Sequence, residues 1–138
     1  MLSLFFIEYM EVKTDTKEKF TVIRVKTPEL SATLAAELAR PLEELLKGKE
    51  RNVVLNLAGV NNVQEEAAEV LVRLQQKFYE SGASFVVCEL QQAVEDFLDS
   101  KNLLELMNVT PTETEAGDIV QMEEIERELL DEEETPLS

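Results

Sequence analysis

Acidic and amide side chains gather where a buried strand should meet a helix. The aliphatic residues 53–57 predict a strand covered on both faces, and a short turn separates them from Gln64, Glu65 and Glu66. The free N–H groups and the macrodipole of a helix N-terminus stabilise anions. Because Glu65 and Glu66 place two carboxylates at this terminus, we expect the junction to repel free anions and to present negative charge to a protein.

Catalytic chemistry finds little support among the other residue types. The chain has no histidine, which excludes Ser-His and Cys-His nucleophile pairs. Cys88 lies in an aliphatic run, so we expect a small core residue and not a nucleophile. No EF-hand spacing or phosphate-binding glycine loop occurs. The sequence therefore predicts a non-enzymatic protein without a cofactor or metal.

The charge of the chain is strongly negative and unevenly placed. The 138 residues include 13 basic and 29 acidic ones, for a formal charge of −16. From Glu113 to the end there are eleven acidic residues against Arg127 alone, a net charge of −10. Such a field disfavours nucleic acid and anionic membrane surfaces as partners. Two interpretations of the acidic end stay open, namely a solvated helix face with a frayed tail and a surface for a basic protein.

The N-terminal residues give no sign of export. Residues 2–7 are apolar, but they lack a basic flank and are far shorter than a membrane span. The single cysteine excludes an internal disulfide framework. We therefore expect a cytoplasmic protein. Residues 1–9 are interpreted as an apolar extension, for which an added strand, a disordered segment and a misplaced start codon are all open.

Helix and strand patterns alternate along the remaining chain. Residues 10–14 and 20–26 predict a hairpin, residues 84–90 a buried strand and residues 109–111 an edge strand. A helix starting near Ser31 carries a leucine stripe, and Pro41 within it should kink or split it. Further helices are expected after Gln64, around Val94, and from Thr112, where Glu115 completes a capping box.

The alternating order predicts one α/β domain, with a mixed, mostly parallel sheet of about four to five strands and about four flanking helices. We place this domain at residues 10–130 and an acidic tail at residues 131–138. The last helix should dock on the domain through an apolar stripe, which consists of Ile119, Met122, Ile125 and Leu129.

Over roughly residues 10–130 the chain resembles the STAS domain of anti-sigma factor antagonists. That family carries an aliphatic strand that ends in Asp-Ser-Ser/Thr-Gly before a helix; here Gln64 matches the Asp, Glu65 and Glu66 the hydroxyl pair, and Ala67 the glycine. Three further matches support the resemblance. Ser31 stands where the family has the Asp of a Glu-Leu-Asp entry to the first helix, and Asn56 stands where many members have an Asp in the central strand. Gly82 and the strand that contains Cys88 are similar to the family's segment of glycine, strand and Cys.

The resemblance implies a module that binds an anti-sigma factor, which is often itself a kinase, and thereby releases a sigma factor. In the family, phosphorylation of a hydroxyl at the junction prevents binding, since a phosphoryl group adds close to two negative charges. Glu65 and Glu66 have no hydroxyl to accept it. The usual phosphoswitch is therefore expected to be absent at these positions.

Three interpretations of Gln64, Glu65 and Glu66 follow. The two glutamates are ordinary first-turn acids, favoured by the helix dipole; or they are a fixed surrogate for the phosphorylated state; or they form a docking surface for a different, basic protein. We predict a partner-binding surface at Asn62, Gln64, Glu65, Glu66 and Ala67.

The sequence thus favours an anti-sigma factor antagonist that contacts an anti-sigma factor or a related kinase. The alternative is a structural or scaffolding subunit that self-associates through its first nine residues or binds an unrelated regulatory protein; a homodimer is compatible with both.

Overall fold

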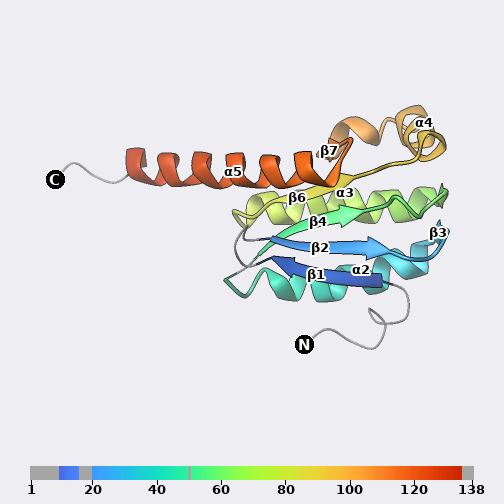
Figure 1. Cartoon of the computed structure of the whole chain (residues 1–138), viewed down its shortest axis with the longest axis horizontal. Coiled ribbons are helices and arrows are strands. Elements are labelled where there is room, and N and C mark those ends of the chain that lie inside the picture. The colour runs from blue at the N-terminus through green and yellow to red at the C-terminus, as the bar shows by residue number, and fades with distance from the viewer. Residues whose placement is uncertain (1–9, 16–19, 50, 135–138) are drawn as a thin grey trace.

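The computed structural model describes residues 10–15, 20–49 and 51–134, and in them a five-stranded sheet forms the centre (Figure 1). Its order is β1-β2-β4-β6-β7, and only β1 is antiparallel to its neighbour. The strands are β1 (Met10–Asp15), β2 (Phe20–Val25), β4 (Asn52–Asn56), β6 (Phe85–Cys88) and β7 (Val109–Thr110). The predicted hairpin, mostly parallel sheet and edge strand are confirmed.

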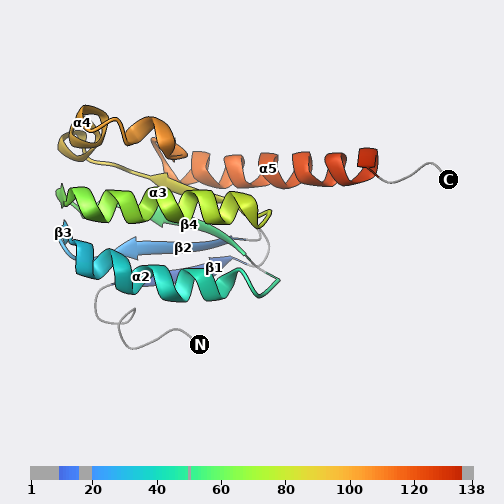
Figure 2. The same cartoon turned by 180° about the vertical axis from the view of Figure 1, so that it is seen from behind.

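Helices cover both faces of this sheet. Helices α2 (Ala32–Leu45) and α3 (Glu65–Glu80) lie side by side on one face, as Figure 2 shows, and α5 (Glu113–Glu134) packs on the other. Helix α4 (Gln92–Ser100) and the short helix η1 (Leu104–Leu106) connect β6 to β7. A separate parallel pair, β3 (Glu29–Leu30) and β5 (Asn62–Val63), precedes α2 and α3. The predicted α/β fold is confirmed.

Alternation along each strand separates two cores. In β2, Ile23 and Val25 join the larger core under α2 and α3, whereas Phe20 and Val22 join the smaller core under α5. Cys88 belongs to the smaller core and is fully buried, as expected. The face under α5 has an apolar centre and polar ends, since Asn52 and Asn56 stand on either side of Val54 in β4.

Helix α2 continues through Pro41 and is not split, so that part of the expectation is wrong. Proline removes one helical hydrogen bond, and the carbonyl that loses its partner belongs to Glu37, an exposed residue. Leu38 and Leu42, on either side, are fully buried against the sheet. Packing of this leucine stripe keeps the helix in one piece despite the proline.

The last helix docks on the sheet as predicted, and Ile119 of the predicted stripe packs there, but the other three stripe residues do not. The α5 residues in the core are Ala116 and Val120, both fully buried, with Ile119 packed beside them. Met122, Ile125 and Leu129 are 54–56% exposed. Ala116 and Val120 face the strands because polar contacts of Glu113 and Glu123 fix which side of the helix turns inward. The helix also runs to Glu134, past the expected start of the tail.

Candidate functional site

The starts of α2 and α3 lie side by side, held by the two-stranded sheet of β3 and β5. In this pair Glu29 stands opposite Asn62, and Leu30 opposite Val63. The backbone N–H of Gln64 donates to the Leu30 carbonyl at 3.1 Å, which extends the pairing to the first residue before α3. Two helix N-termini that are 33 residues apart in the chain therefore form one surface.

Helix α2 receives a cap from each side of this junction. Ser31 Oγ accepts the N–H of Leu34 at 3.1 Å, and the Gln64 side chain accepts the N–H of Ala32 through Oε1 at 2.9 Å. Both N–H groups lie in the first turn, where they have no partner within the helix. Gln64, which precedes α3, thus caps the neighbouring helix and makes no side-chain cap for α3. The sequence did not show this role, because the two partners are distant in the chain.

The remaining predicted site residues divide between surface and core. Glu65 pairs with Lys101 Nζ at 3.3 Å, with both side chains about half exposed, whereas Glu66 is exposed. Asn62 is exposed too, and its Nδ2 donates to Glu29 Oε2 at 2.5 Å. Ala67 is fully buried in the larger core. Four of the five predicted residues therefore share one surface, and the side chain of Ala67 is unavailable to a partner.

We predict that Gln64→Ala lowers the free energy of unfolding by about 1 kcal/mol, the usual cost of losing a helix cap. The physical reason is the exposed but unpaired N–H that the substitution leaves at Ala32. Urea denaturation measures the change, and Glu66→Ala, on the same turn, serves as the control. An unchanged urea midpoint for Gln64→Ala would show that water replaces the amide without cost.

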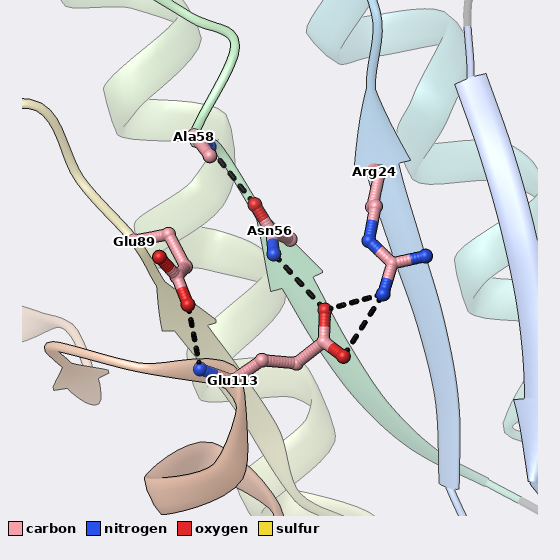
Figure 3. A network of polar contacts seen from close by, with 5 residues as sticks. All are labelled: Arg24, Asn56, Ala58, Glu89 and Glu113. Carbon is pink, nitrogen blue, oxygen red and sulfur yellow. Dashed lines mark hydrogen bonds and ion pairs between the residues drawn. The ribbon is translucent and has the colours of Figure 1, made fainter.

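A second polar group, which the sequence did not predict, joins α5 to the carboxyl ends of three strands (Figure 3). Glu113, the first residue of α5, accepts Arg24 NH2 at 2.9 Å with both carboxylate oxygens and accepts Asn56 Nδ2 at 3.0 Å. Its own N–H donates to Glu89 Oε2 at 3.0 Å. Asn56 Oδ1 also accepts the N–H of Ala58 at 2.9 Å. We call Arg24, Asn56, Glu89 and Glu113 the carboxyl-end network.

Polar contacts recur at the opposite end of the strands. Glu123 Oε1 accepts Ser84 Oγ at 2.6 Å, and Glu124 Oε1 accepts Asn52 Nδ2 at 2.6 Å. Arg127 donates to Ser84 Oγ at 3.2 Å and to Asn52 Oδ1 at 3.4 Å. Helix α5 is therefore held by polar contacts at both ends of the sheet and by apolar packing between them.

The chemical environment of Cys88 opposes a nucleophilic role. Burial is the largest cause that raises the pKa of its thiol to about 12, and the nearby Glu113 and Glu89 carboxylates raise it further. The thiolate is the nucleophilic form of cysteine, so it is scarcely populated at neutral pH.

Two further kinds of site were sought in the part of the chain that the structure describes. It contains no group of three cysteine or acidic side chains arranged to hold a metal ion. None of its helices has the length and apolar character needed to cross a membrane.

Comparison with known proteins gives one family and several structures. A family model described as the STAS domain matches residues 11–116. A search of the curated proteins found no match. Three solved structures share the fold. TM1081 of Thermotoga maritima has a TM-score of 0.68 at 19% identity, covering 86% of this chain and 99% of its own.

An anti-sigma-factor antagonist (STAS) domain protein of Planctomyces limnophilus has a TM-score of 0.68 at 22% identity, over 81% of this chain and 97% of its own. The Bacillus cell fate determinant SpoIIAA in its phosphorylated form has a TM-score of 0.59 at 14% identity, covering 80% of this chain and 98% of its own.

Proposed function

Because this chain belongs to the STAS domain family, we propose that it is a non-enzymatic protein-interaction module, an anti-sigma factor antagonist that works without the usual phosphoswitch. The observation that carries the proposal is the junction of α2 and α3, where Gln64 joins the two helix starts and Glu66 stands exposed on the first turn of α3. A surface that is fixed before binding loses little conformational entropy when a partner binds.

The names of two relatives support the assignment to anti-sigma factor antagonists. The Planctomyces protein and SpoIIAA are both named as such antagonists, and one structure of SpoIIAA is of its phosphorylated form. In the present chain, Glu65 and Glu66 replace the hydroxyl pair of the family motif. Neither glutamate has a hydroxyl group, so phosphorylation at these two positions cannot control binding. We propose that the two glutamates are a constant part of the contact surface.

The charge of the junction favours a partner with basic contacts. Lys101 already offsets part of the charge of Glu65, at 3.3 Å, so Glu66 is the carboxylate that we expect a partner to meet. Asn62 and the outer atoms of Gln64 add hydrogen-bonding groups on the same surface. We infer that an arginine or lysine of the partner approaches Glu66 at the rim of this surface.

We predict that Glu65→Ala/Glu66→Ala binds its partner at least about tenfold more weakly, a loss of about 1.4 kcal/mol. The measurement is recovery of the partner from a lysate by the tagged protein, followed by titration with the purified partner. The matched control is Glu37→Ala/Glu105→Ala, which removes two exposed carboxylates elsewhere.

The same experiment separates the three interpretations of the glutamates. Weaker binding by the double variant supports the docking surface. Equal recovery of the partner by the wild type and the double variant would mean that the glutamates only stabilise the first turn of α3, and it would contradict the proposed surface. Stronger binding of the double variant to an anti-sigma factor would mean that the two glutamates imitate the phosphorylated state and lower the affinity of the wild type.

A further inference from the structure

The outer side of α5 carries an apolar stripe that the domain leaves uncovered. Its members are three α5 residues that are 54–56% exposed and share one side of the helix, namely Met122, Ile125 and Leu129, and we call them the α5 outer stripe. Exposed Glu126 and Glu128 flank it. Arg127 is turned toward the sheet, where it donates to Ser84 and Asn52. The outer side of α5 is therefore apolar and acidic.

A groove of complementary character lies between α2 and α3. It has a volume of about 450 Å³ and an apolar lining formed by Ala36, Ala39, Val70 and Leu74. Arg40, Arg73 and Lys77 also line it, against the single carboxylate of Glu43, which pairs with Lys77 at 3.3 Å. On a chain with a formal charge of −16, this groove is thus locally basic.

The two surfaces have similar lengths, and their charges are opposite. Residues 36–43 of α2 and 70–77 of α3 line the groove over about two helical turns, or roughly 10 Å at about 1.5 Å per residue. The α5 outer stripe extends over the same length, from Met122 to Leu129. Small residues at Ala36 and Ala39 leave room for a third helix to approach. An acidic amphipathic helix therefore fits this groove.

We propose that the α5 outer stripe of one molecule docks in the α2–α3 groove of a second copy. Figure 2 shows α5 projecting away from the domain beyond the end of α3, so its own groove is out of its reach. Such a contact joins two different surfaces, and it closes into a dimer when it is made reciprocally or continues into a chain when it is not. The contact does not involve the start of α3, so it stands independently of the proposed partner surface.

Complementary charge reversal tests this contact. One variant, Glu126→Lys/Glu128→Lys, reverses the helix, and another, Arg40→Glu/Arg73→Glu, reverses the groove. Sedimentation velocity at rising concentration should show association of the wild type and at least about a tenfold weaker association of each variant alone, since like charges then meet at the rim of the contact. An equimolar mixture of the two variants should associate again, because opposite charges then face each other.

A variant with a matched change of charge controls for indirect effects of net charge. Circular dichroism of each variant controls for loss of folding. Asp99→Lys/Glu105→Lys makes the same change of net charge as Glu126→Lys/Glu128→Lys, at exposed positions away from both surfaces, and should associate like the wild type. The proposal is overturned if the wild type stays monomeric at every concentration, or if both variants associate as it does. It is also overturned if association disappears only when residues 1–9 are deleted, or if the mixture of variants stays monomeric.

Discussion

Asn56→Asp is expected to destabilise the protein by about 2–3 kcal/mol at neutral pH, although the resemblance to STAS domains implies an aspartate at this position. Asn56 is only 7% exposed, and its amide nitrogen lies 3.0 Å from Glu113 Oε1. The substitution replaces this donor with a carboxylate oxygen, so two negative charges meet where a hydrogen bond existed. Arg24, already bound to Glu113, offsets only part of that repulsion.

The destabilisation should shrink as the pH falls. Repulsion and burial raise the pKa of the introduced carboxyl above its value of about 3.9 in the unfolded chain. Between these two values the native state binds more protons than the unfolded state, so its stability rises as the pH falls through that window. Urea denaturation of variant and wild type at several pH values measures the difference.

Asn56→Ala provides the control for this pH dependence. It removes the same amide without adding a charge, so its loss of stability relative to the wild type should lack the pH dependence of the aspartate. A difference between Asn56→Asp and the wild type that stays constant with pH would contradict an electrostatic origin.

Val120→Asp is expected to release α5 from the sheet and to cost about 3 kcal/mol, since it places an unpaired charge in an apolar contact. Val120 is fully buried and packs with Phe20, Val22 and Val54. The carboxylate regains water only if the helix leaves the sheet. Urea denaturation gives the loss of stability, and faster amide hydrogen exchange along α5 and the α5-facing strands identifies the segment that opens.

Leu129→Asp is the matched control, because it makes a similar change on the same helix at a residue that is 54% exposed. Its effect should stay within about 0.5 kcal/mol when measured at low protein concentration. Equal losses for the two variants would contradict the assignment of Ala116 and Val120 as the docking face.

The sheet and helices were predictable because their signals are local. Alternation in residues 20–25, the continuous aliphatic run at 53–57 and the spacing of the leucines in α2 each express contact with one side of a covered sheet. The start of α5 was predictable too, since Thr112 Oγ1 accepts the N–H of Glu115 at 3.1 Å within a four-residue motif. These features need no knowledge of distant segments.

The packing of α5 was not predictable from its periodicity. The pattern favours the largest apolar residues of the helix, whereas the sheet selects Ala116 and Val120 because the polar contacts of Glu113 and Glu123 fix which side turns inward. Those contacts join residues that are 57 and 39 positions apart in the chain.

The candidate site was predictable in position but not in its internal contacts. The aliphatic strand and the first-turn acids indicated the junction, whereas the bond from Ala32 to Gln64 joins residues 32 positions apart. The salt bridge of Glu65 depends on Lys101, which follows a different helix. Sequence spacing carries no information on either pair.

The two polar ends of the α5 contact have a mechanical consequence. A slide of the helix by one turn, about 5.4 Å, would separate Glu113 from Arg24 and Glu123 from Ser84 in the same movement. No shifted position of the helix therefore keeps the contacts at one end while losing those at the other. The polar contacts at both ends of the sheet therefore define one register of α5.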